Sequence, residues 1–165
     1  EQAKAEANWP KFLVLHERPY RLEALLTASA LGLKGRAFWG LMAWVWTDGE
    51  GPRVNRALWQ QLFRAAKADP DGAALMTEEE RLFMTQLPNR ITVYRGGSHR
   101  GMSWTLDREK ALFFARWFNS GTGTIWTVTT SKAHIAAYFS GRNEQEIILL
   151  TTRGALPQKV SATSK

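Results

Sequence analysis

The sequence predicts an α+β fold in which a helical first half precedes a second half built from short strands. Before residue 88, apolar residues recur at helical spacing in several segments. After residue 90, the apolar segments are short, β-branched or aromatic, and glycine-rich turns separate them. The charge balance changes at the same place, because residues 1–89 hold 11 Lys and Arg and 11 Asp and Glu, whereas residues 90–165 hold 11 and 4. We therefore expect a helical N-terminal lobe over 1–89 and a second part over 90–165, packed as one compact unit.

Four helices are expected in the first half, over residues 22–33, 36–47, 55–66 and 77–86. The second of these segments is apolar on most sides, which is typical of a buried helix. Asn55 is a favourable N-cap for the third, and Thr77 with Glu80 forms a capping box at the start of the fourth. The tryptophans on these helices are more often core residues than stacking platforms.

The second half is expected to contain a sheet and one helix. Asp107 is the predicted cap of that helix, whose apolar residues recur at i, i+3, i+4 and i+7 up to Phe118. The polar tail after Pro157 is expected to fray. The segments with strand character or a short apolar run are 91–94, 103–105, 124–130, 135–139 and 147–150.

Composition excludes several classes of protein. With 165 residues, 44% of them apolar and 12% aromatic, the chain can bury a hydrophobic core and is neither disordered nor collagen-like. The absence of cysteine excludes a disulfide framework, a cysteine nucleophile and a thiolate metal site. With three His, no metal site is expected, and no stretch approaches the 18 apolar residues of a membrane span. The sequence begins at Glu1 rather than at Met, which leaves the natural N-terminus open.

The net charge of +7 lies entirely in the second part of the chain. A basic part of this kind indicates an anionic ligand, such as a nucleic acid, a dinucleotide or a membrane surface. Charge that serves only solubility is the alternative, and charge alone does not decide between them.

Two motifs in residues 90–165 carry side chains suited to ligand binding. Arg95 ends a predicted strand and is followed by glycines, so its guanidinium can meet a ligand that approaches the backbone closely. Ser103 and Thr105 alternate with Trp104, which places both hydroxyls on one face of a strand. Taken singly, each motif also fits an ordinary strand end.

A pair of acidic residues forms a third motif. Glu144 and Glu146 stand at i and i+2 at the entrance to an apolar strand, and alternation predicts that they share a face. Paired like charges cost free energy unless a cation or a hydroxyl offsets them. We therefore predict that one carboxylate stabilises a developing cation and that the other positions or deprotonates a nucleophile. A polar strand edge is the alternative.

In this order, the three motifs resemble the Arg-Ser-Glu, or cholera-toxin-like, class of mono-ADP-ribosyltransferases. The spacing also fits, with eight residues from Arg95 to Ser103 and about forty from there to Glu144. The resemblance covers roughly residues 90–155 and implies a split, mostly antiparallel sheet with an NAD cleft. Trp104 stands in the middle of the serine motif in place of a small hydroxyl residue, and Gly141 replaces the usual aromatic before the first glutamate.

The resemblance implies a role in NAD binding for five residues. Arg95 would grip the phosphates or the nicotinamide ribose, and Gly96 would offer its backbone to the nicotinamide amide. Ser103 would hydrogen-bond the catalytic glutamate and the ribose, and Thr105 would support the side of the NAD site that Ser103 forms. Glu146 would be the catalytic glutamate, which binds the ribose 2′-hydroxyl and stabilises the oxocarbenium ion as nicotinamide leaves.

The resemblance also implies an acceptor site before the last apolar strand. Glu144 would orient or deprotonate the acceptor, and residues 138–143 would form the loop that recognises it. The acceptor contacts expected there are Tyr138, Phe139, Arg142, Asn143 and Glu144.

The implied activity is mono-ADP-ribosyl transfer from the co-substrate NAD+ to a macromolecule, with release of nicotinamide and without a metal. The basic second part favours an RNA or DNA base as acceptor, whereas Glu-x-Glu in this family usually accompanies arginine on a protein. An NAD glycohydrolase and a non-catalytic nucleic-acid-binding module are further alternatives. Small enzymes of this class often act as toxins or in phage–host conflict, so we expect action in the cytoplasm and an antitoxin or immunity protein as a partner.

Overall fold

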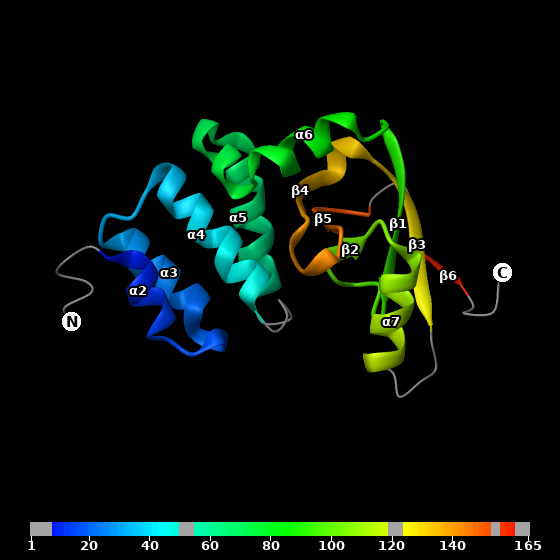
Figure 1. Cartoon of the computed structure of the whole chain (residues 1–165), viewed down its shortest axis with the longest axis horizontal. Helices are drawn as coiled ribbons and strands as arrows, with labels where there is room; N and C mark the ends of the chain where they lie inside the picture. The colour runs from blue at the N-terminus through cyan, green and yellow to red at the C-terminus, as the bar shows by residue number, and fades with distance from the viewer. Residues whose placement is uncertain (1–7, 50–54, 119–123, 153–155, 161–165) are drawn as a thin grey trace. The chain divides into compact units, whose positions relative to one another are not determined.

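The chain divides into two compact units, residues 1–77 and 78–165. The computed structural model describes residues 8–49, 55–118, 124–152 and 156–160. The described part of the first unit is helical, and the second unit carries the sheet (Figure 1). The expected α+β class is therefore confirmed.

The first unit has a core of aromatic side chains. Trp46 lies edge-on to Trp59 and to Phe63, with ring centroids 5.0 and 4.9 Å apart, and all three are buried. Trp39 is also buried, and its Nε1 donates to Asp69 Oδ2 at 3.0 Å. The prediction that the helical tryptophans are core residues is confirmed for Trp39, Trp46 and Trp59, whereas Trp44, which was included in it, is half-buried. The elements of this unit are α2 (Trp9–Val14), η1 (Arg18–Tyr20), α3 (Arg21–Ala30), α4 (Gly35–Asp48), α5 (Arg56–Ala68) and η2 (Pro70–Leu75).

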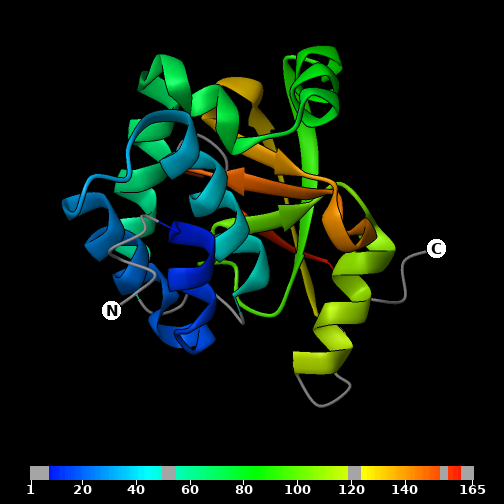
Figure 2. The ribbon, with the colours of Figure 1, turned by 60° about the vertical axis from the view of Figure 1, so that its left-hand side comes forward.

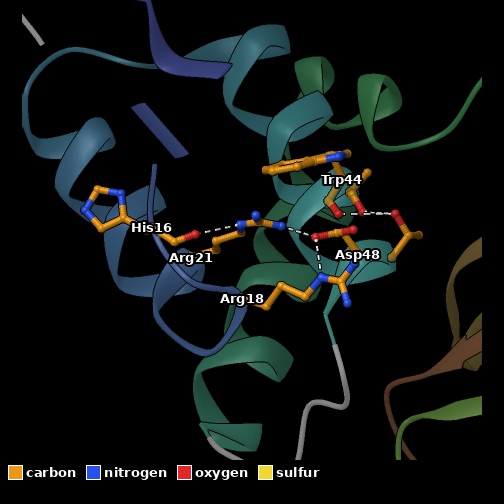
Figure 3. A network of polar contacts seen from close by, with 7 residues as sticks. His16, Arg18, Arg21, Trp44 and Asp48 are labelled. Carbon is orange, nitrogen blue, oxygen red and sulfur yellow. Dashed lines mark hydrogen bonds and ion pairs between the residues drawn. The ribbon is translucent and has the colours of Figure 1, made fainter. Parts of the chain in front are cut away.

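A polar network joins the start of α3 to the end of α4 (Figure 3). The guanidinium of Arg21 donates to the carboxylate of Asp48 and to the carbonyl oxygen of His16, and its Cζ lies 4.9 Å from the ring centroid of Trp44. Arg18 adds an ion pair to Asp48 at 3.3 Å. Because the Arg21 side chain is only 14% exposed, its charge requires these partners.

The described residues of the second unit form one six-stranded sheet in the order β4-β5-β2-β1-β3-β6. Every neighbouring pair is antiparallel, and Figure 2 shows β5 and β2 side by side as orange and green arrows. The four predicted strands form at or within two residues of their expected bounds, and the short apolar run at 135–139 is also a strand. The strands are β1 (Arg90–Gly96), β2 (Ser103–Thr105), β3 (Ile125–Ser131), β4 (Ile135–Phe139), β5 (Glu146–Leu149) and β6 (Gln158–Val160), with η3 (Lys132–His134) and η4 (Gly141–Asn143) between them.

Helix α7 (Arg108–Phe118) covers one face of this sheet. Asp107 caps it as predicted, because its Oδ1 accepts from the backbone N–H of Glu109 at 2.8 Å and of Lys110 at 3.2 Å. The buried side of the helix, formed by Ala111, Leu112 and Ala115, packs with Ile125 of β3. The helix begins three residues after the end of β2 and packs against β1 and β3.

Helix α6 (Glu78–Gln86) belongs to the second unit, where contacts join it to β4 and to the residues on either side of that strand. Phe83 stacks on Tyr138 of β4 with ring centroids 4.3 Å apart. The carboxylate of Glu80 accepts from the backbone N–H of Ser140 at 2.7 Å and from its hydroxyl at 3.0 Å. Lys132 Nζ donates to two carbonyl oxygens at the end of the helix, at 2.7 and 3.0 Å. The two compact units meet between residues 77 and 78, whereas the sequence prediction set its boundary after residue 89.

The first three residues after Pro157 do not fray as expected, and residues 161–165 of the predicted tail lie outside the described residues. Gln158, Lys159 and Val160 pair with Thr127, Trp126 and Ile125 of β3 and close that edge of the sheet. The sequence prediction was wrong here because a three-residue polar strand shows no apolar alternation of its own.

Candidate functional site

The three strands that carry the predicted motifs, β1, β2 and β5, are neighbours in the sheet. Their register forms one row across the sheet, in which Tyr94 pairs with Thr105, Thr105 with Glu146, and Glu146 with Phe139. Residues paired in this way lie on the same face. Ser103 shares that face because it lies two residues before Thr105. The sheet therefore brings the serine motif and Glu146 together.

The Arg95 side chain leaves β1 on the opposite face, because side chains alternate along a strand, and it contacts this group at the backbone of Ser103. Its Nη1 donates to the backbone carbonyl oxygen of Ser103, and its Nε donates to that of Ser98 at 2.7 Å. Gly101 lies so close that a Cβ there would overlap the Arg95 guanidinium. The half-buried Arg95 thus fixes the loop between β1 and β2, a role that the sequence did not predict.

Gly96 has a packing role that is independent of any ligand. A Cβ on Gly96 would lie 2.9 Å from the carbonyl carbon of Phe114, and closer still to Ala111 O and Ala115 N. Helix α7 can therefore approach β1 this closely only at a glycine. The expected contact between the Gly96 backbone and nicotinamide stays a prediction.

Thr105 joins the serine motif to the glutamate motif. It is 6% exposed, and its hydroxyl donates to the backbone carbonyl oxygen of Glu144 at 2.6 Å and accepts from the N–H of Asp107 at 3.0 Å. Its register partner Glu146 is half-buried, as is Ser103. Trp104 is 2% exposed and points to the opposite face, as the alternation predicted.

Glu144 and Glu146 do not lie on one extended strand, so that part of the sequence prediction was wrong. β5 begins at Glu146, and Glu144 is the C-cap of η4 with φ −98° and ψ −16°. Gln145 between them has a φ of +46°, in the left-handed region. This turn breaks the alternation on which a shared face was predicted.

The expected acceptor loop is shorter than the sequence suggested. Tyr138 and Phe139 belong to β4 and are 6% and 4% exposed, so they are core residues rather than loop residues. Asn143 is exposed, with a φ of +53°. For Arg142 the structure describes the backbone in η4, and its side chain lies outside the described part. Of the residues in the expected loop whose exposure the structure describes, Ser140, Gly141 and Asn143 are therefore the exposed ones.

Glu80 holds the turn that leads to the glutamate motif, and the sequence did not predict this role. It is 7% exposed, and its carboxylate holds Ser140 at the start of the turn that leads to Glu144 and Glu146. Burial, and secondarily the charge of Glu80, raises the pKa of the neighbouring Tyr138. The capping-box pattern at Thr77 pointed to Glu80 as a helix cap, and no local signal connects it to a residue sixty positions later.

Among the described residues, there is no cluster of three or more side chains of the kinds that hold a metal ion. No helix in that part of the chain is long and apolar enough to cross a bilayer. Comparison of the chain with protein-family models, with curated proteins and with solved structures gives no match.

Proposed function

We propose that the second unit is an ADP-ribosyltransferase-like catalytic domain that transfers ADP-ribose from NAD+ to a base of a nucleic acid. One observation carries this proposal: the strands that bear Arg95, Ser103 and Glu146 are adjacent, in the order β5-β2-β1, although about forty residues separate β2 from β5. The sequence order of the motifs does not by itself require this adjacency. Two further contacts support it, the bond from Arg95 to the Ser103 carbonyl and the register pair of Thr105 with Glu146.

In the proposed reaction, the bond between nicotinamide nitrogen and ribose C1′ breaks, and its electron pair leaves with nicotinamide. A nitrogen or oxygen of the acceptor then bonds to C1′ and loses its proton. Positive charge develops on the ribose, and a fixed carboxylate stabilises it. Glu146 suits that role because it is half-buried beside Thr105 and Ser103.

Glu144 suits the second role, in which a carboxylate orients the acceptor or accepts its proton. Its backbone carbonyl oxygen accepts a hydrogen bond from the Thr105 hydroxyl at 2.6 Å. This bond to β2 holds the Glu144 backbone in place just before β5. Because Gln145 turns the chain, the two carboxylates are set by a turn rather than by one strand face. That geometry allows different directions of approach to the ribose and to the acceptor.

A nucleic acid is the acceptor that the charge favours. Residues 78–165 hold twelve Lys and Arg and seven Asp and Glu, a net charge of +5. NAD+ itself carries little negative charge, whereas each nucleotide of a nucleic acid adds a phosphate. Action in the cytoplasm as a toxin or conflict effector, opposed by an antitoxin or immunity protein, is part of the same proposal.

The test measures nicotinamide release and the fate of the label. The chain is incubated with NAD+ labelled in its adenylate part, together with single-stranded RNA, single-stranded DNA or an arginine-rich protein. We expect nicotinamide release with label on the nucleic acid, and a loss of about 10²- to 10³-fold in the rate for Glu146→Gln. Glu78→Gln is the matched control, because it makes the same change at an exposed residue of the same unit.

Each other outcome selects an alternative. Label on the arginine-rich protein alone identifies a protein arginine acceptor, and loss of NAD+ without a labelled macromolecule identifies a glycohydrolase. If no nicotinamide is released and Glu146→Gln behaves like the parent, the unit is not an enzyme of this class.

A further inference from the structure

Helix α7 carries a pair of aromatic rings on the surface of the second unit. Phe113 and Trp117 lie one helical turn apart, with side chains 56% and 75% exposed. Their rings are stacked, with centroids 6.2 Å apart and planes inclined by 26°. The opposite side of the helix is buried against the sheet. Single exposed apolar side chains are common on protein surfaces, but two stacked aromatic rings form a patch that fits a ligand.

Positive charge surrounds this aromatic pair. Lys110 lies three residues before Phe113, and Arg116 lies three residues after it, so helical spacing places both beside the rings. Arg116 is exposed, and Lys110 is half-buried. The acid of α7, Glu109, forms an ion pair with Arg108 at 3.3 Å. A ligand of the aromatic pair therefore meets cations at its edges.

We propose that Phe113 and Trp117 form a platform on which bases of a single-stranded nucleic acid stack, while Lys110 and Arg116 contact its phosphates. Aromatic side chains bind bases of any sequence through their faces, and cations that flank them follow the backbone. The net charge of +5 in this unit is complementary to a polyanion.

Other occupants fit these observations less well. A second copy of the chain, docked through the same patch on both partners, would bring Lys110 and Arg116 toward their own copies, and like charges would repel. An amphipathic helix on a membrane inserts a broad apolar face. In α7 the apolar face formed by Ala111, Leu112 and Ala115 is already buried in the protein.

A nucleic acid bound to the platform could also be the acceptor of the proposed reaction. This inference alone rests on the proposed function. Helix α7 begins beside Thr105, the register partner of Glu146. From Asp107 to Trp117, a rise of about 1.5 Å per residue gives about 15 Å along the helix. At about 3.4 Å per stacked nucleotide, that length corresponds to roughly four nucleotides. A strand bound at Trp117 can therefore extend to the start of the helix, and tight binding is expected to require more than about four nucleotides.

The experiment measures binding without NAD+, so its result is independent of catalysis. Fluorescence anisotropy of an end-labelled 12-nucleotide RNA of mixed sequence is recorded with the full chain at several salt concentrations. We expect Trp117→Ala to weaken binding about tenfold, and Trp117→Ala with Phe113→Ala to weaken it further. Leu82→Ala is the control, because Leu82 is 58% exposed on α6 of the same unit, and it is expected to change the affinity less than twofold. Alanine favours helix, so circular dichroism should show α7 intact.

Charge is tested separately by Arg116→Gln, which is expected to reduce the slope of log affinity against log salt by about one. Parent-like RNA affinity in both aromatic variants would falsify the platform, whatever the NAD+ assay shows. So would loss of binding to anionic phosphatidylserine vesicles without loss of RNA binding, or loss of dimerisation alone in sedimentation. RNA binding that depends on Trp117 without any nicotinamide release leaves the platform in place and refutes the proposed function.

Discussion

Replacement of Gly96 by alanine tests the contact between α7 and β1, which sets the architecture around the site. Gly96 is the last residue of β1 and pairs with Ile125 of β3. The added Cβ would point into α7, where it would meet backbone atoms of Ala111, Phe114 and Ala115. Backbone atoms of a helix cannot rotate away, so the helix itself must shift.

The magnitude follows from the distances. Ordinary van der Waals contacts of a Cβ lie at 3.4–4 Å. The Cβ added at Gly96 would lie less than 3.0 Å from each of the three backbone atoms. A shift of about 0.5–1 Å would disturb the packing of Ala111, Ala115 and Ile125, and overpacking of this kind costs about 1–3 kcal/mol. Alanine also restricts the unfolded chain, which offsets roughly 0.4–1 kcal/mol. We expect a net loss of about 1.3 kcal/mol from these two terms, or roughly 5–10 °C in Tm for a unit of this size.

The assay is urea unfolding followed by far-UV circular dichroism. Gly141→Ala is the matched control, because a Cβ on Gly141 meets nothing within 4 Å and its φ is not positive. The control is expected to change the free energy of unfolding by less than about 0.5 kcal/mol. Equal stability of the Gly96 and Gly141 variants would refute the close approach of α7 to β1, and with it the placement of the site beside the helix.

Two more substitutions test individual contacts. The folded pKa of Tyr138 is raised above its unfolded value, so its contribution to stability is present below about pH 10 and is lost as pH rises through the folded pKa. In Glu80→Gln we expect this alkaline loss of stability, measured from urea midpoints between pH 7 and 11, to be smaller. At pH 7 the same variant should be less stable by about 1 kcal/mol. A larger alkaline loss in Glu80→Gln would contradict this coupling. Asp48→Asn removes the carboxylate beside the largely buried Arg21 and should cost about 1–2 kcal/mol in thermal unfolding, whereas Arg18→Gln, at a residue whose side chain is 51% exposed, should cost less than about 1 kcal/mol. Equal losses in these two variants would show that burial of Arg21 does not matter.

Local features of the sequence were sufficient for most elements of the second unit. The strand at 103–105 and the helix capped by Asp107 form as predicted, because apolar spacing and a capping side chain act within a few residues. The same local rules failed at Glu144, where alternation was assumed before β5 begins. A left-handed residue at Gln145 has no apolar pattern that reveals it.

The candidate site shows the same division between local and distant causes. The sequence indicated Arg95, Ser103, Thr105 and Glu146 as a set, and Thr105 and Glu146 are indeed register partners. It did not indicate that the Arg95 guanidinium would hold the backbone between β1 and β2. It also placed Tyr138 in a loop, although Phe83 of α6 covers it. These contacts depend on segments that are distant in the chain.

The sequence by itself determined the class of fold, the sites of most helices and most strands, and the concentration of positive charge in the second part, but it did not indicate α2. Each of these depends on composition or on spacing within one turn or one strand. Only the tertiary structure decided that β2 lies between β1 and β5, that Glu80 anchors Ser140, and that α7 leaves Phe113 and Trp117 exposed. The physical reason is that strand pairing and burial depend on which distant surfaces meet, and a local pattern fixes only which side of an element is apolar.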